Sequence, residues 1–215
     1  MDTKNAMPLT RRRFLALAAA LAAAACTKTT RHAAIPRGGT VLALGDSLTY
    51  GYGASPEAAY PARLAALTGW EVVNGGVSGD TAAQALARLP DLMKRQPKLV
   101  LLGIGGNDFL RRIPEAETRR HIGETIVAVQ GAGVPLVLIA EPKPSLGALV
   151  GSLSDHPLYE ELAEQYRVPL FAKGWSRILG DNGLKSDAIH ANAEGYALFA
   201  QRLAAFLQEQ GFWRG

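Results

Sequence analysis

The sequence predicts a three-layer α/β/α domain built on a five-stranded, mainly parallel sheet. From Thr40 onward, short runs rich in β-branched and aliphatic residues alternate with longer amphipathic segments. Most of the short runs are almost continuously apolar, which is typical of parallel strands that helices cover on both faces. The alternation itself is the pattern of repeated βαβ units. A chain of 215 residues is long enough to bury the core of one such domain and to carry additional segments.

Periodicity places the individual strands and helices. Apolar residues recur at helical spacing in residues 82–93, 122–129 and 196–207, and Pro90 is expected to kink or split the first of these helices. No internal repeat or low-complexity tract interrupts the alternation. The five predicted strands are residues 41–44, 70–74, 98–104, 134–140 and 168–171.

Residues 1–26 have the features of an export signal. A basic stretch precedes twelve small or apolar residues, 14–25, which as a helix would cover roughly 18 Å and are too few to span the ~30 Å hydrocarbon core of a bilayer. Residues 10–15, TRRRFL, resemble a twin-arginine signal; the alternative is an ordinary secretory signal, in which any three cations would serve. We therefore expect an exported protein, in the periplasm or at the cell surface.

Cys26 directly follows the apolar segment and is the only cysteine, so the chain has no partner for an intramolecular disulfide. Its position resembles a bacterial lipobox, although Ala23 stands where leucine is usual. We expect lipidation of Cys26 and hence a membrane anchor; the alternative is cleavage by the general signal peptidase, with Cys26 a bystander. Residues 27–39 would then form a polar tether and residues 40–212 the folded domain.

The net charge of the chain gives no reason to expect a nucleic-acid partner. Residues 1–25 contribute +3 of the formal net charge of +4, so the rest of the chain carries only +1. A basic surface that attracts polyanions needs a larger excess of cations.

The residues whose side chains could take part in a reaction directly follow the predicted strands. In open parallel sheets, functional side chains gather beyond the carboxyl ends of the strands. The segments at those ends are GDSLTYG (45–51), NGGVSGDT (74–81), GGND (105–108), EPKPSLG (141–147) and, before the last helix, DAIH (187–190).

A hydroxyl, an imidazole and a carboxylate occur in these loops. Ser47 is either part of a capped turn or a nucleophile; it does not lie in a G-x-S-x-G elbow, because Thr49 replaces the second glycine. Asp187 precedes His190 by three residues, a spacing at which the carboxylate can bind Nδ1 and leave Nε2 as a base. The alternatives are a surface histidine or a metal pair, but two ligands without a cysteine or a third acid make a poor metal site.

Two other loops carry hydrogen-bond donors suited to an oxyanion. The glycines around Gly79 permit backbone conformations that aim N–H groups at one point, and Asn107 offers a neutral donor. The alternatives are a left-handed turn before a helix capped by Asp80, and an ordinary Asn107-Asp108 turn. Jointly, the loops supply a base, an orienting acid, a hydroxyl and oxyanion donors on one sheet.

The remaining histidines are weaker candidates for the base. His32 lies in the expected tether, and His121 lies on an arginine-rich helix. His156 belongs to a segment in which Ser154 or Asp155 is expected to be the N-cap of a helix.

The four blocks LGDSLTYG, NGGVSGDT, GGND and DAIH resemble those of the SGNH, or GDSL, hydrolases. They occur in that family's order and spacing, and the resemblance covers nearly all of residues 40–210. Within the family, the chain is similar in character to small bacterial arylesterases and multifunctional thioesterase/lysophospholipases. The resemblance implies a flavodoxin-like α/β/α fold. Many relatives have proline after the catalytic histidine, whereas this chain has Ala191 and then Asn192, a plausible N-cap for the last helix.

The resemblance implies a role for each matched residue. Ser47 would be the nucleophile, His190 the general base and acid, and Asp187 the group that orients the imidazole. The backbone N–H groups of Ser47 and Gly79 and the side chain of Asn107 would form the oxyanion hole. The reaction would pass through an acyl-enzyme and need no metal or organic cofactor.

The substrate is less well specified. Relatives line the acyl pocket with the loop after the fourth strand, here 141–156, where the apolar residues are either pocket lining or the loop's own small core. They are Leu146, Leu149, Val150 and Leu153. Small aryl or alkyl esters and lysophospholipid-type acyl esters are the expected substrates. A carbohydrate O-deacetylase and a non-catalytic, lipid-binding lipoprotein are the alternatives, and Asp46 is expected to brace its loop rather than react.

Overall fold

The computed structural model describes residues 32–143 and 153–215. The chain divides into two units, Met1–His32 and Ala33–Gly215, and the second contains the fold. The expected export signal with Cys26, residues 27–31 of the expected tether, and three of the four pocket candidates lie outside the described residues. These three are Leu146, Leu149 and Val150.

The sheet has five strands, all parallel, in the order β2-β1-β3-β4-β5. Each predicted strand is present, although the observed bounds differ by a few residues. The strands are β1 (Thr40–Gly45), β2 (Glu71–Gly76), β3 (Leu99–Gly103), β4 (Leu136–Ile139) and β5 (Leu170–Phe171).

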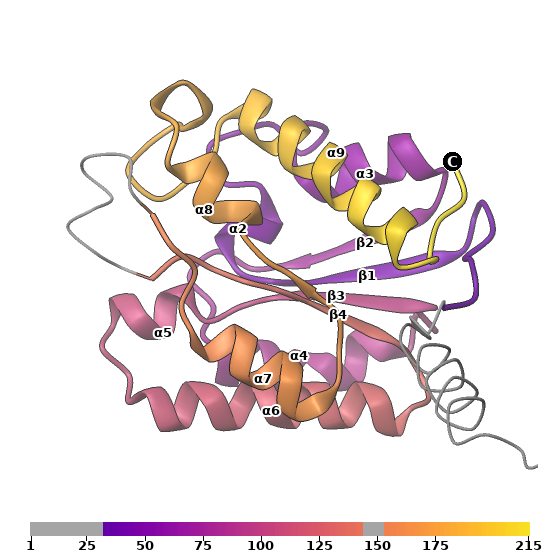
Figure 1. Ribbon diagram of the computed structural model, residues 1–215, viewed down its shortest axis with the longest axis horizontal. Helices are drawn as coiled ribbons and strands as arrows, with labels where there is room; N and C mark the ends of the chain where they lie inside the picture. The colour runs from indigo at the N-terminus through magenta and orange to yellow at the C-terminus, as the bar shows by residue number, and fades with distance from the viewer. Residues whose placement is uncertain (1–31, 144–152) are drawn as a thin grey trace, which may run out of the picture. The chain divides into compact units, whose positions relative to one another are not determined.

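Helices cover both faces of the sheet, which confirms the predicted three-layer fold (Figure 1). One face carries α2 (Ser47–Tyr50), α3 (Tyr60–Thr68), α8 (Gly174–Leu179) and α9 (Ala193–Glu209). The other face carries α4 (Ala82–Met93), α5 (Gly106–Leu110), α6 (Glu115–Gly131) and α7 (Leu158–Tyr166). A short 3₁₀ helix, η2 (Asn182–Leu184), precedes the DAIH loop. Within residues 32–143 and 153–215, none of the helices has the length and apolar character needed to span a bilayer.

Successive side chains of the strands pack alternately into two separate hydrophobic cores, one on each face of the sheet. Val41 and Ala43 of β1 pack with the helices α3, α8 and α9, whereas Leu42 and Leu44 pack with α4, α6 and α7. The first core is rich in aromatic rings, and Trp175 stacks on Phe199 with a ring-centroid distance of 3.6 Å. Because helices cover both faces, β1, β3 and β4 lack the alternating polar residues of a sheet with one solvated face.

The start of α4 differs from the alternative in which Asp80 caps the helix. Thr81, not Asp80, is the N-cap, and it forms a capping box with Gln84. Asp80 is instead bound by Arg88, whose Nε lies 2.8 Å from Oδ2. Pro90 neither ends nor splits the helix, which runs on to Met93.

Two other helix starts were predicted with different success. Asn192 caps α9 as expected, since its Oδ1 accepts a hydrogen bond from Gly195 N–H at 2.9 Å. The expectation of a Ser154 or Asp155 cap for α7 is wrong. The side chain of Asp155 accepts a hydrogen bond from Lys173 N–H, and His156 Nδ1 accepts the N–H of Leu158 at the start of α7.

Two neighbouring residues of α6 allow a matched test of the second core. Ile126 is fully buried, whereas the side chain of Val127 is 54% exposed. We expect Ile126→Ala to lower the free energy of unfolding by about 2–5 kcal/mol, because it leaves a cavity. Val127→Ala should change it by no more than about 0.5 kcal/mol. Urea unfolding of both variants checks this, and equal effects would contradict the assignment of the buried face.

Candidate active site

Ser47 lies at the carboxyl end of the central strand β1, at the first position of the one-turn helix α2. The strand can turn so tightly because residue 45 is glycine: a Cβ there would collide with the carbonyl of Gly103 and the side chain of Thr49. Asp46 caps the turn, and its Oδ1 accepts the N–H of Leu48 at 3.0 Å. The turn therefore holds the Ser47 hydroxyl at the edge of the sheet.

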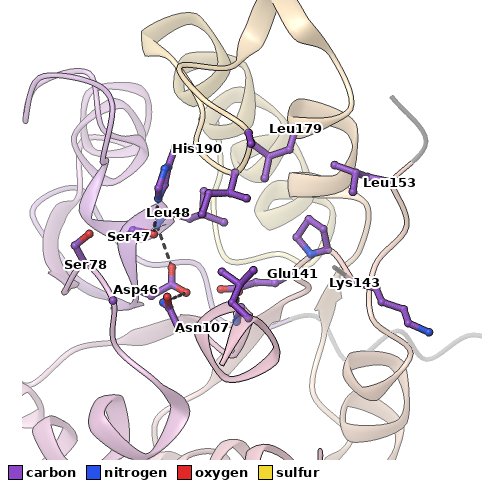
Figure 2. Close-up of a pocket in the computed structure, with 16 residues that line it drawn as sticks. Asp46, Ser47, Leu48, Ser78, Asn107, Glu141, Lys143, Leu153, Leu179 and His190 are labelled. Carbon is purple, nitrogen blue, oxygen red and sulfur yellow. Dashed lines mark hydrogen bonds between the residues drawn. The ribbon is translucent and has the colours of Figure 1, made fainter. Parts of the chain in front are cut away.

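The DAIH loop brings an imidazole to that hydroxyl. His190 Nε2 lies 3.0 Å from Ser47 Oγ, and His190 Nδ1 lies 2.7 Å from Asp187 Oδ2. The ring of Tyr52 also packs on the imidazole, with a centroid distance of 4.4 Å. Figure 2 shows the imidazole pointing toward Ser47 at one side of the cavity. The structure thus joins Asp187, His190 and Ser47 in one line of hydrogen bonds.

Asp187 is held as an anion. Burial alone would raise the pKa of its carboxyl, but hydrogen bonds from the backbone N–H of Ile189 and from His190 outweigh burial and lower the pKa. Asp187 Oδ1 accepts the N–H groups of Ile189 and His190, both at 2.9 Å. An anionic acceptor at Nδ1 keeps the proton there and leaves Nε2 available to Ser47.

Backbone hydrogen bonds also close the DAIH loop. Ser186 N–H donates to the carbonyl of His190 at 3.0 Å, and Asn192 N–H donates to that of Leu184 at 2.9 Å. Ala191 is fully buried and forms a β-bridge with Lys185. The loop is therefore fixed without the proline that many relatives have at position 191.

Ser47, Gly79 and Asn107 all border the space beside the Ser47 hydroxyl. Gly79 adopts φ +87°, a left-handed conformation that favours glycine. Within the described part of the chain, no hydrogen bond is formed by the N–H of Ser47 or of Gly79. The side-chain amide of Asn107 donates to the carbonyl of Asp80 at 3.0 Å and to Asp46 Oδ2 at 3.3 Å. The structure therefore brings together all five residues proposed from the sequence.

Arg88 of α4 connects the loops beneath this site. Its guanidinium binds Asp80 and also donates to the carbonyls of Gly75, at 3.0 Å, and Gly45, at 3.4 Å. These contacts tie the ends of β1 and β2 to the loop that contains Gly79. Arg88 thus fixes the separation of Ser47 from Gly79.

A cavity of about 370 Å³ opens next to Ser47. Its walls are mostly aliphatic, and Leu153 is the one pocket candidate from the sequence that lies within the described residues. Lys143 also borders the cavity, but in Figure 2 its side chain extends away from it. The apolar side chains of the lining are Leu48, Leu110, Pro142, Leu153, Leu179, Ala188 and Ile189.

Buried acids form the floor of the site. Asp46, Asp108 and Glu141 are each at most 2% exposed. Burial raises the pKa of Asp46 to about 7, and the charges of Asp108 and Asp80 add to this effect, although the hydrogen bond from Leu48 opposes it. Burial raises the pKa of Glu141 well above its ordinary value, and the charge of Asp46 raises it further. Low-dielectric surroundings therefore favour the neutral carboxyl groups here.

The other titratable candidates lie elsewhere. His156 stacks on Phe109 with a centroid distance of 4.2 Å, and His121 is paired with Arg120. Among residues 32–143 and 153–215, no group of three or more His, Cys, Asp or Glu side chains is arranged to hold a metal ion.

Sequence reasoning missed three residues of the site. Tyr52, Arg88 and Glu141 contact the reacting groups or their supports. Tyr52 directly follows the block that contains Ser47, so this closeness in sequence was the available signal. Arg88 and Glu141 act through contacts across the fold, for which the local sequence contains no signal.

Comparison with known proteins gives a consistent result. Residues 43–198 match the model of the GDSL-like Lipase/Acylhydrolase family. The chain is 35% identical over 175 residues to Thioesterase 1/protease 1/lysophospholipase L1 of Escherichia coli (strain K12), which covers 79% of this chain and 83% of the relative. It is 32% identical over 173 residues to an arylesterase of Vibrio mimicus, with coverage of 76% and 86%.

Solved structures share the fold. The crystal structure of TesA matches with a TM-score of 0.69 and 25% identity, over 80% of this chain and 99% of that one. The esterase EstA from Pseudoalteromonas sp., inhibited by monoethylphosphonate, matches with a TM-score of 0.68 over 79% of this chain and 97% of that one. At 24% identity, the second likeness supports the fold alone.

The raised pKa of Asp46 predicts a pH-dependent stability. Between about pH 4 and 7, the folded protein binds more protons at this group than the unfolded chain does, so the group's stabilising effect is complete below the window and is lost as the pH rises through it. Relative to Asp46→Asn, the wild type should lose stability with a slope approaching about 1.4 kcal/mol per pH unit. Urea unfolding at several pH values measures both slopes. Parallel curves would contradict burial of a titrating Asp46.

Proposed function

This chain belongs to the GDSL-like lipase/acylhydrolase family, whose members hydrolyse esters, and from that premise we propose that it cleaves carboxylic esters through Ser47, His190 and Asp187. One observation carries the proposal. The hydroxyl, imidazole and carboxylate are joined by hydrogen-bond distances of 3.0 Å and 2.7 Å at the mouth of an apolar cavity. This is the arrangement that activates a serine nucleophile.

In the first half of the reaction, Ser47 Oγ attacks the carbonyl carbon of the ester. His190 Nε2 accepts the hydroxyl proton, and anionic Asp187 stabilises the imidazolium that results. The carbonyl oxygen becomes an oxyanion, which accepts hydrogen bonds from the amides of Ser47 and Gly79 and from Asn107, whose amide exchanges its 3.3 Å bond to Asp46 Oδ2 for the oxyanion. The tetrahedral intermediate then expels the alcohol, which takes its proton from His190, and the acyl group remains on Ser47.

In the second half of the reaction, water cleaves the acyl-enzyme. His190 Nε2 accepts a proton from the water as its oxygen attacks the acyl carbon, and the same oxyanion donors stabilise the second tetrahedral intermediate. Collapse releases the carboxylic acid and returns the proton to Ser47. Each donor of this kind is worth about 2.7–4 kcal/mol of the activation barrier.

The cavity supports small aryl and alkyl esters, or lysophospholipid-type acyl esters, as substrates. Its volume of about 370 Å³ lies near the lower end of the ~300–1,000 Å³ range of small-molecule pockets. The side chains of Leu153, Leu179 and Ile189 would contact an acyl chain of moderate length. The relatives' names include arylesterase, thioesterase and lysophospholipase, so both substrate classes are represented among similar proteins.

We further propose that the protein is exported and anchored in a membrane by lipidated Cys26. The proposal rests on the basic and apolar residues 10–25 and on the position of the single cysteine after them.

A series of p-nitrophenyl esters from acetyl to palmitoyl tests the reaction. We expect hydrolysis of short and medium chains, and a loss of kcat of roughly 10⁶-fold in Ser47→Ala, because no nucleophile remains. Ser55→Ala, which changes an exposed serine in the following loop, is the matched control and should resemble the wild type. Full activity of Ser47→Ala would refute the proposal. Preference for acetylated glycans over all of these esters would favour a carbohydrate O-deacetylase.

Fractionation of cells tests the anchor. The wild type should remain with the membranes, whereas Cys26→Ala should move into the soluble fraction, since it lacks the acyl chains that contribute about 0.8 kcal/mol per buried CH₂. Replacement of Thr27 by serine is the control, because it leaves the cysteine in place. Identical fractionation of the Cys26 variant and the wild type would refute the lipid anchor.

A further inference from the structure

A buried carboxyl group that the proposed reaction does not use lies beneath the loop of Asn107. Glu141 follows β4 and is 1% exposed. Its Oε2 accepts the backbone N–H of Gly106 at 2.6 Å. Its Oε1 is buried and has no hydrogen-bond partner in the described part of the chain. Figure 2 shows the carboxyl group of Glu141 directed toward Asp46 and Asn107.

The bond to Gly106 fixes the start of α5. Gly106 is the first residue of this helix, and Gly105 before it has no side chain with which to cap the helix. Glu141 supplies the missing acceptor from a different strand, and the two groups approach so closely that a Cβ on residue 106 would collide with Oε2. Asn107 is the next residue, so the position of its amide depends on this contact.

Asp108 holds the same helix from its other side. Its Oδ2 accepts the N–H of Ala82 at 2.9 Å, and its Oδ1 accepts the hydroxyl of Thr118 at 3.3 Å. The short helix α5 is therefore clamped between two buried acids, one from its own sequence and one from the end of β4. Asn107 lies between the two clamped residues.

The surroundings of Glu141 contain acids and phenols. The groups that face it are Asp46 at the N-cap of α2, Asp108 of α5, Tyr60 of α3 and Tyr159 of α7. Among the described residues, no cation forms an ion pair with it. An unpartnered buried hydroxyl costs less free energy than an unpartnered buried anionic oxygen. The environment therefore favours a proton on Oε1.

We propose that Glu141 is a positioning residue of the oxyanion hole: it holds Asn107 in place through Gly106 and, by keeping its proton, prevents a second negative charge from forming beneath the oxyanion. The proposal rests on the proposed function, since it acts through Asn107 and Ser47. Asp46 is the acid that ionises first, with a pKa of about 7, and its charge then opposes ionisation of Glu141.

Steady-state hydrolysis of p-nitrophenyl acetate at pH 7 tests the positioning. We expect Glu141→Ala to lower kcat by about 10- to 100-fold with KM changed less than about twofold, because Asn107 is displaced from the oxyanion and not from the ground-state ester. Glu141→Gln keeps an oxygen that can accept the Gly106 N–H and should retain most of kcat. A wild-type kcat in Glu141→Ala, or a change confined to KM, would overturn the proposal.

The pH dependence of kcat tests whether Glu141 keeps its proton. In the wild type, ionisation of Glu141 at alkaline pH adds a charge beneath the oxyanion, whereas the side-chain amide of the Glu141→Gln variant stays neutral. Because burial raises the pKa of Glu141 well above its ordinary value, the ratio of kcat in Glu141→Gln to kcat in the wild type should stay near one and constant around neutral pH, and should rise only where Glu141 ionises. Asp46 and Asp108 are present in both proteins and largely cancel in the ratio, and Tyr60 and Tyr159 stay neutral because burial raises the pKa of both phenols. A ratio that rises with pH around neutrality, or one well above one throughout, would overturn this part of the proposal.

Two control variants, together with Ser47→Ala, separate failure of the role of Glu141 from failure of the proposed function. Glu164→Gln removes an exposed acid of α7, and Val129→Ala weakens the core under α6; neither should change kcat or its pH profile. If Glu141→Ala does not fold, the kcat of Glu141→Gln and its pH dependence still test the proposal. Hydrolysis that survives Ser47→Ala would refute the proposed function itself. Ser47-dependent hydrolysis with wild-type behaviour of both Glu141 variants would refute only the role of Glu141.

Discussion

The site depends on the register of the three central strands. Gly45 at the end of β1 pairs with Gly76 of β2 and Gly103 of β3, so the three strands end at one level. A Cβ at Gly45 or Gly76 would collide with the neighbouring backbone, and α2 passes directly over the end of β2. Without side chains at these positions, the loops that follow the strands meet in a small space. The proposed nucleophile and oxyanion donors lie together because the backbone itself is close-packed there.

The imidazole reaches this space from a different direction and needs separate support. The DAIH loop lies between η2 and α9, and its ends are joined by a β-bridge between Lys185 and Ala191. Asn192 caps α9 and also donates to the carbonyl of Gly183 at 2.7 Å. Since α9 packs into the aromatic core with Trp175 and Phe199, the position of His190 is set by that core.

The sequence was sufficient wherever the signal is local. Continuous apolar runs predicted the parallel strands, and the Asp187–His190 spacing predicted their contact, because both are properties of a few consecutive residues. Contacts between distant segments were not predictable in this way. Arg88 binds Asp80 and leaves Thr81 to cap α4, and Glu141 binds Gly106 across 35 positions of sequence. An acid after an apolar strand resembles any solvent-exposed loop residue until the fold buries it.

The acids of this site differ in charge because their environments differ. Asp187 is partly exposed and accepts hydrogen bonds from two backbone N–H groups and His190, so its anion is stabilised. Asp46 and Glu141 lie under the site, where burial disfavours the anion. The proposed reaction forms a cation on His190 and an anion on the substrate oxygen. A charged acid is therefore favourable beside the imidazole, and a neutral Glu141 is favourable beneath the oxyanion. The same residue type serves both needs because solvent and hydrogen bonds, and not sequence, set its charge.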